Sequence, residues 1–163
     1  MVSYKSEFEI NDDGSLQKFI ENAEKLAGHV EVGVLGDKTH IGGGGGKRPI
    51  NMADLTAIYV FGVPSQNIPK RDFVTPVIEQ NQDKYIGYIE EKVIPILQGD
   101  VSMQEVWQFI GMEAKADIQD YMVNGKFAPL SPKTIKRKGS SKPLIDTGQL
   151  RKAVSYIVVK GSK

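Results

Sequence analysis

The sequence predicts an α+β fold, in which helices cover one face of a small, mostly antiparallel sheet. Strand-like segments alternate apolar and polar residues near both ends of the chain, at 4–10, 30–35 and 153–160. Helix-like segments repeat apolar residues every three or four positions, at 15–27, 76–97 and 102–123. We therefore expect strands from opposite ends of the chain to pair, and a length of 163 residues to form a single domain over 1–163.

The first strand and the first helix flank a turn. Tyr4, Phe8 and Ile10 alternate with polar residues, and the Asn-Asp-Asp-Gly run that follows them is typical of a turn. Ser15 is a suitable N-cap for the helix that begins there.

A glycine-rich run at 41–48 follows the second strand. Five consecutive glycines and a lysine resemble part of a phosphate-binding loop. The spacing fails, because that motif needs a glycine where the chain has Ile41 and a Ser or Thr where it has Arg48. We expect a mobile loop here, since consecutive glycines lose the most entropy on ordering.

Helix boundaries are marked in the middle of the chain. Asn51 is a suitable N-cap for a short helix that Gly62 ends. Thr75 is expected to cap the helix near 76–97 and Pro76 to begin it, and Pro95 is expected to kink or end it.

The helix predicted near 102–123 begins with a capping box, because Ser102 is followed by Glu105 three positions later. Trp107 lies away from the centre of its apolar stripe. Two interpretations are open for this indole: a packing residue at the rim of the core, or an interface anchor.

Residues 127–151 predict a short helix, a basic loop and a tight corner. Ser131 and Pro132 are typical of a helix start, and Gly139 is suited to a left-handed exit. Cations occupy the last helical turn, where they oppose the negative end of the helix dipole.

The corner that follows is expected to fold on itself. Leu144 and Ile145 would anchor it in the core, and the side chains of Asp146 and Thr147 would accept backbone N–H groups before Gly148.

The stretches 131–139 and 143–151, together with 55–62 and 68–73, resemble tail-completion or virion-morphogenesis proteins of tailed bacteriophages. Asp72 departs from the proline that is common in that family, and the glycine run is a second departure. The resemblance implies a structural protein of the virion, assembled in the bacterial cytoplasm. It would form a ring, hexameric or dodecameric, at the head–tail junction, with dsDNA passing through and other neck, connector and tail proteins as partners.

Charge is distributed unevenly along the chain, although the net charge is only +1. From residue 124 onward ten Lys and Arg face one acid, which gives +9, while residues 1–123 hold eleven basic and nineteen acidic residues, which gives −8. Three interpretations are open: a solvated basic tail, contact with nucleic-acid phosphates, or docking of one copy's basic part on the acidic part of another.

The charge pattern and the resemblance together predict one of two function classes. The first is a self-assembling structural subunit, and the second is a stand-alone nucleic-acid-binding module, weakened by the lack of aromatic residues between Lys133 and Arg151. The candidate contacts with a partner or with DNA are Lys133, Lys136, Arg137, Lys138, Lys142, Arg151, Lys70 and Arg71.

An enzyme is not expected. The chain has no cysteine, and His29 and His40 lack a partner at metal-ligand spacing, so we expect no catalytic set, metal or cofactor. No apolar run approaches the roughly 20 residues of a membrane helix, so we also expect no membrane contact.

Overall fold

The computed structural model of the protein describes residues 27–34, 39–40 and 50–161 and the single positions 14, 18 and 21. The strand predicted at 4–10 and the loop predicted at 41–48 lie outside the described residues. Within the helix predicted at 15–27, the described positions Lys18 and Glu21 are helical.

The main sheet joins two strands that are far apart in the sequence. β1 (Gly28–Val34) pairs antiparallel with β4 (Val154–Lys160), so that Gly28 lies opposite Lys160 and Val34 opposite Val154. The strands predicted at 30–35 and 153–160 are confirmed, as is the α+β class. A second, short antiparallel pair that the sequence did not predict joins β2 (Thr39–His40) to β3 (Ile50–Asn51).

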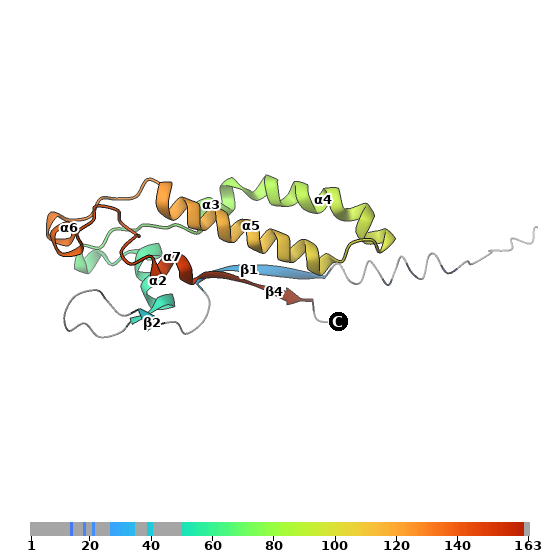
Figure 1. The fold of residues 1–163 in the computed structure, drawn as a ribbon, viewed down its shortest axis with the longest axis horizontal. Coiled ribbons are helices and arrows are strands. Elements are labelled where there is room, and N and C mark those ends of the chain that lie inside the picture. The colour runs from blue at the N-terminus through green and yellow to red at the C-terminus, as the bar shows by residue number, and fades with distance from the viewer. Residues whose placement is uncertain are drawn as a thin grey trace, which may run out of the picture.

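Helix α5 (Met103–Asn124) lies between the sheet and α4 (Gln82–Gln98), so the molecule has three layers along its length (Figure 1). The capping box is present: the Ser102 hydroxyl accepts the Glu105 N–H at 3.2 Å, and the Glu105 carboxylate accepts the Ser102 N–H at 2.8 Å. On the sheet side, the Tyr156 ring lies directly against Gly111 of α5. Only a residue without a side chain allows this approach.

The helical segment predicted near 76–97 is confirmed, but the structure divides it into two helices, α3 (Thr75–Gln80) and α4. Asn81 separates them, and both its backbone N–H and its side-chain amide donate to the Val77 carbonyl, at 3.1 and 2.9 Å. Asparagine side chains compete for backbone groups in this way and interrupt helices. Pro95 does not end α4, which continues to Gln98 and stops at Gly99 in a left-handed conformation.

A network of charged and polar side chains attaches α4 to α5. The Lys84 ammonium contacts the carboxylates of Asp117 and Glu113, each at 2.9 Å, and the Tyr85 hydroxyl donates to Asp117 at 2.8 Å. Burial raises the pKa of Tyr85, and the hydrogen bond to Asp117 raises it further. Lys84 is therefore engaged within the molecule.

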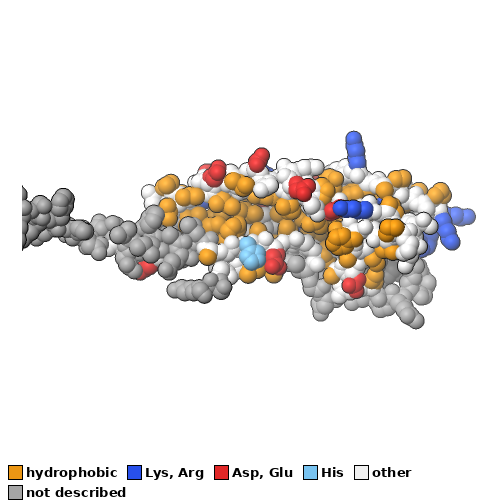
Figure 2. Space-filling view, turned by 180° about the vertical axis from the view of Figure 1, so that it is seen from behind, with side chains coloured by type: hydrophobic (Ala, Val, Ile, Leu, Met, Phe, Trp, Pro, Cys, Tyr) orange, Lys and Arg blue, Asp and Glu red, His pale blue; other side chains and the backbone are white. Residues whose placement is uncertain are grey.

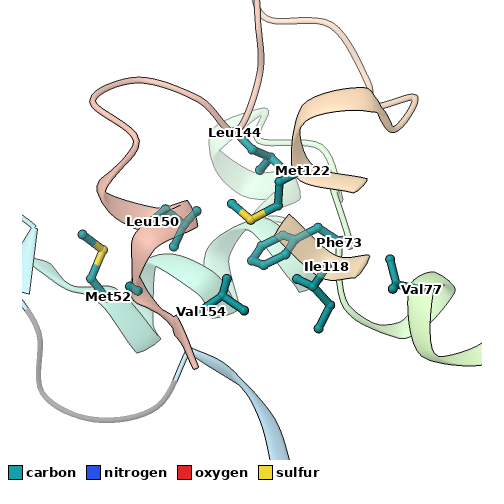
Figure 3. Packing of buried hydrophobic residues seen from close by; sticks show 9 residues of the cluster. Met52, Phe73, Val77, Ile118, Met122, Leu144, Leu150 and Val154 are labelled. Carbon is teal, nitrogen blue, oxygen red and sulfur yellow. The ribbon is translucent and has the colours of Figure 1, made fainter. Parts of the chain in front are cut away.

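The first core cluster fills one end of the molecule, where α2 (Met52–Phe61), α5 and α7 (Gln149–Ala153) meet the sheet. Figure 3 shows Phe73, which is fully buried, at its centre beside Met122 and Ile118. Its buried members are Met52, Phe73, Val77, Ile118, Met122, Leu144, Leu150, Ala153 and Val154. Leu144 anchors the corner in the core, as predicted.

A second cluster lies toward the other end, between α4, α5 and β1. Its buried residues are Ile96, Met103, Val106 and Ile110. Trp107 packs against this cluster, half-buried, and its indole nitrogen lies 3.2 Å from the point where a Cβ on Gly28 would sit. This packing is the first of its two predicted roles; the interface role stays a prediction.

Candidate partner interface at the basic end

One end of the molecule carries a group of exposed cations: Lys70, Lys133, Lys136, Arg137 and Lys142. α6 (Pro132–Lys138), the corner at 139–148 and the loop at 62–71 lie together there (Figure 1). Lys and Arg side chains gather at this end, and acidic side chains lie along the body (Figure 2). We call these three segments, together with the adjoining Phe61, the basic end.

The α6 helix is built as predicted. The Ser131 hydroxyl accepts the Thr134 N–H at 3.2 Å, Pro132 occupies the first helical position, and Gly139 has a φ of 72° with its N–H on the Ile135 carbonyl at 2.8 Å. Both helix ends are therefore satisfied, so α6 presents its side chains from a defined scaffold.

Four of the predicted contacts are free to meet a partner. Each is exposed, and within the described residues none makes an ion pair. They are Lys133, Lys136, Arg137 and Lys142.

Lys138 is not a free contact of this kind. Its ammonium turns back to the corner and donates to the carbonyls of Lys142 and Pro143, the latter at 3.1 Å. Burial lowers the pKa of Lys138; Asp146 acts in the opposite direction, and Arg71 lowers it further. Lys138 therefore closes the loop at 139–143.

Arg71 was predicted to lie in a solvated loop or to contact a partner, and this is wrong. Its side chain is buried, at 5% exposure. The guanidinium donates from Nε to the Ala128 carbonyl at 2.7 Å and from Nη2 to the Pro129 carbonyl at 2.8 Å. Burial lowers the pKa of Arg71, and the nearby Tyr59 opposes that change. The residue ties the loop at 62–71 to the segment that leads into α6.

Lys70 and Arg151 are exposed but already have partners. The Lys70 ammonium lies 3.3 Å from the Asp72 carboxylate. Arg151 donates from Nε to the Gln119 carbonyl at 3.2 Å, and the Gln119 amide donates to the Arg151 carbonyl at 2.9 Å. The two hydrogen bonds between Arg151 and Gln119 hold α7 against α5.

The capping role predicted for Asp146 and Thr147 is also wrong. The N-terminus of α7 has no side-chain cap, and Gly148 occupies the N-cap position with a φ of 76°. Among the described residues neither Asp146 nor Thr147 makes a hydrogen bond through its side chain, and both are exposed. The corner is held instead by buried Leu144 and by the conformation of Gly148.

Asp72, not Thr75, caps the start of α3. Its Oδ1 accepts the N–H groups of Val74 and Thr75, each at 3.1 Å. Burial alone would raise the pKa of Asp72, but these hydrogen bonds and the contact with Lys70 outweigh it, and the pKa is lowered from its usual value.

The Asp72 cap predicts a dependence of stability on pH. We expect Asp72→Ala to lower the free energy of unfolding by about 1 kcal/mol at pH 7. Because the pKa is lower in the folded chain, this contribution is present above the carboxyl's unfolded pKa and is lost as pH falls through the folded one. Urea unfolding at pH 7 and at strongly acidic pH measures it, with exposed Asp146→Ala as the control. A cost for Asp72→Ala that does not shrink in acid would contradict the assignment.

The sequence did not predict an apolar surface at the basic end. Phe61, the last residue of α2, is 76% exposed. It lines an open hollow of about 520 Å³ with Pro64, Ile68, Pro69 and Lys70. The sequence contains a signal for this surface, because Phe61 is followed by Gly62 and, two positions later, by Pro64, which end the helix where little of the chain can cover the ring.

Two further features bear on the chemistry of the described residues. Among the described residues, no three His, Asp or Glu side chains lie close enough to hold a metal ion. No helix in the described part of the chain combines the length and apolar character needed to span a membrane.

The chain was compared with protein-family models, with curated proteins and with solved structures, and none of them matches it.

Proposed function

We propose that this chain is a structural subunit of a tailed-phage virion, part of a ring at the head–tail junction that helps join the tail to the DNA-filled head. The resemblance of residues 55–62, 68–73, 131–139 and 143–151 to tail-completion proteins supports this role. The observation that carries the proposal is the placement of charge: a basic end on a rigid scaffold, beyond a helical body that is acidic.

The charge separation favours assembly. Residues 75–124, which form α3 to α5, hold nine acidic and three basic residues, a net charge of −6. Residues 125–152 hold eight basic residues and one acid, a net charge of +7. Identical copies with opposite charge on two different surfaces attract one another head to tail, and such heterologous contacts generate rings when the rotation closes.

A stand-alone nucleic-acid-binding module is the second candidate. It is favoured by the four free cations on α6 and the corner, which could neutralise phosphates. Lys133, Lys136 and Arg137 all lie on one helix of seven residues, so their charges are close together.

Measurements on the full chain and on virus particles separate the candidates. The structural role predicts a closed oligomer by light scattering and the presence of the protein in finished particles. Particles made without it should have full heads and tails that stay unjoined. The second candidate predicts single copies that shift double-stranded DNA in a gel, with an affinity that falls steeply as salt rises.

A further inference from the structure

The outer face of α4 carries a stripe of exposed residues that no described element covers. The stripe consists of Asp83, Ile86, Glu90 and Ile94, spaced three to four positions apart along the helix. Ile86 is 43% exposed and Ile94 is 60% exposed. Because α5 separates α4 from the sheet, this face points away from the rest of the molecule (Figure 1). We call it the acidic stripe.

The charges of the acidic stripe are free. Lys84 is held by Asp117 and Glu113, and the Lys92 ammonium contacts its neighbour Glu91 at 2.6 Å. Within the described residues, Asp83 and Glu90 make no ion pair. The stripe therefore combines two isoleucines with two unpaired carboxylates.

The basic end has the complementary chemistry. Phe61 and Ile135 are exposed apolar side chains there, at 76% and 36%. Lys133, Lys136 and Arg137 surround Ile135 on α6 and are the free cations described above. The acidic stripe and the basic end therefore each combine exposed apolar side chains with charged neighbours. The charges are negative on the stripe and positive on the basic end.

We propose that the acidic stripe of one copy is the docking surface for the basic end of a second copy. This deepens, and rests on, the proposed assembly into a ring. The occupant is a second copy because the complement of the stripe lies on the same chain. Nucleic acid does not fit, since its phosphates would be repelled by Asp83 and Glu90. Burial of Ile86, Ile94 and Phe61 would supply affinity, and the charges would orient the two copies.

A charge swap tests the pairing in the full chain. Glu90→Lys and Arg137→Glu alone should each weaken self-association about tenfold or more, because each places like charges together at the contact. The double variant Glu90→Lys/Arg137→Glu restores opposite charges and should recover most of the loss. Glu31→Lys is the matched control: it makes the same charge change on an exposed residue of β1, in the layer farthest from α4.

A bulky substitution at Gly87 tests the same surface without removing any side chain. Gly87 lies on α4 between Ile86 and Glu90, is exposed, and has nothing within 4 Å of the position of a Cβ. Gly87→Arg should therefore fold, with a helix at least as stable as that of wild type, and should abolish docking through bulk and charge. Circular dichroism and thermal unfolding check the fold, and sedimentation equilibrium measures the association.

The outcomes separate this inference from the proposed function. Loss in the single variants and in Gly87→Arg, with recovery in the double variant, supports the docking surface. A wild-type oligomer that Glu90→Lys and Gly87→Arg leave intact, or a double variant as weak as the single ones, overturns it while the ring stands. A wild-type chain that remains a single copy overturns both.

Discussion

Replacing Arg71 by alanine is expected to lower the free energy of unfolding by about 3 kcal/mol, because hydrogen bonds from charged groups are strong and buried carbonyls left without a donor are costly. The guanidinium donates to two consecutive backbone carbonyls, at Ala128 and Pro129, across 57 and 58 positions of sequence. Those two bonds join the loop after α2 to the segment that enters α6. Without them, the loop at 62–71 is no longer joined to the segment that leads into α6, and the scaffold of the basic end is loosened.

Two control variants distinguish this anchor from a charge effect. Lys70→Ala removes a neighbouring cation whose side chain is 63% exposed, and should change the free energy of unfolding by about 0.5 kcal/mol or less. Arg71→Lys keeps the charge but loses the fork that reaches both carbonyls, so it should remain clearly destabilised. Urea unfolding measures all three. Equal effects of Arg71→Ala and Lys70→Ala would show that the carbonyl contacts contribute nothing.

Gly111→Val should be destabilising by about 3 kcal/mol, because adding atoms to a packed interface forces the surrounding groups apart. A Cβ at Gly111 would overlap the ring of Tyr156, which packs between α5 and the sheet. The strand β4 is held mainly by this face and by β1. Displacement of the ring therefore disturbs the packing of α5 against the main sheet.

The matched comparison is Gly87→Ala on the neighbouring helix. Gly87 is exposed, with open space where a Cβ would lie, so alanine should stabilise the protein by about 0.5–1 kcal/mol. Thermal unfolding of the two variants and wild type gives the test. If Gly111→Val unfolded at the temperature of wild type, Tyr156 would have to leave its place at no cost, contrary to the packing described.

Local signals in the sequence predicted most element boundaries correctly. The caps at Asn51, Ser102 and Ser131 form as expected, because a cap depends only on side chains within three residues of it. The break at Asn81 was not predicted, because asparagine is tolerated in many helices and its bond to Val77 is one of several choices open to it. The continuation of α4 past Pro95 likewise depends on the surrounding packing.

The candidate site could be predicted only in part. Helical spacing correctly placed Lys136, Arg137 and Lys138 in the last turn of α6. Helical spacing could not distinguish Lys138 from its free neighbours. Its ammonium donates to the carbonyls of Lys142 and Pro143, and only the fold of the corner places these carbonyls beside it. Arg71 was misplaced for the same reason: its two acceptors lie more than fifty residues away.

The mass of the full chain in solution, for wild type and for Lys136→Glu/Arg137→Glu, tests the central claim most directly. Both residues are exposed and free of ion pairs within the described part, so the variant should unfold at the same denaturant concentration as wild type. Light scattering should show wild type as a closed oligomer and the variant as a single copy at equal concentration. A wild-type chain that remains solitary at its highest soluble concentration, or a variant that assembles equally well, would contradict assembly through the basic end.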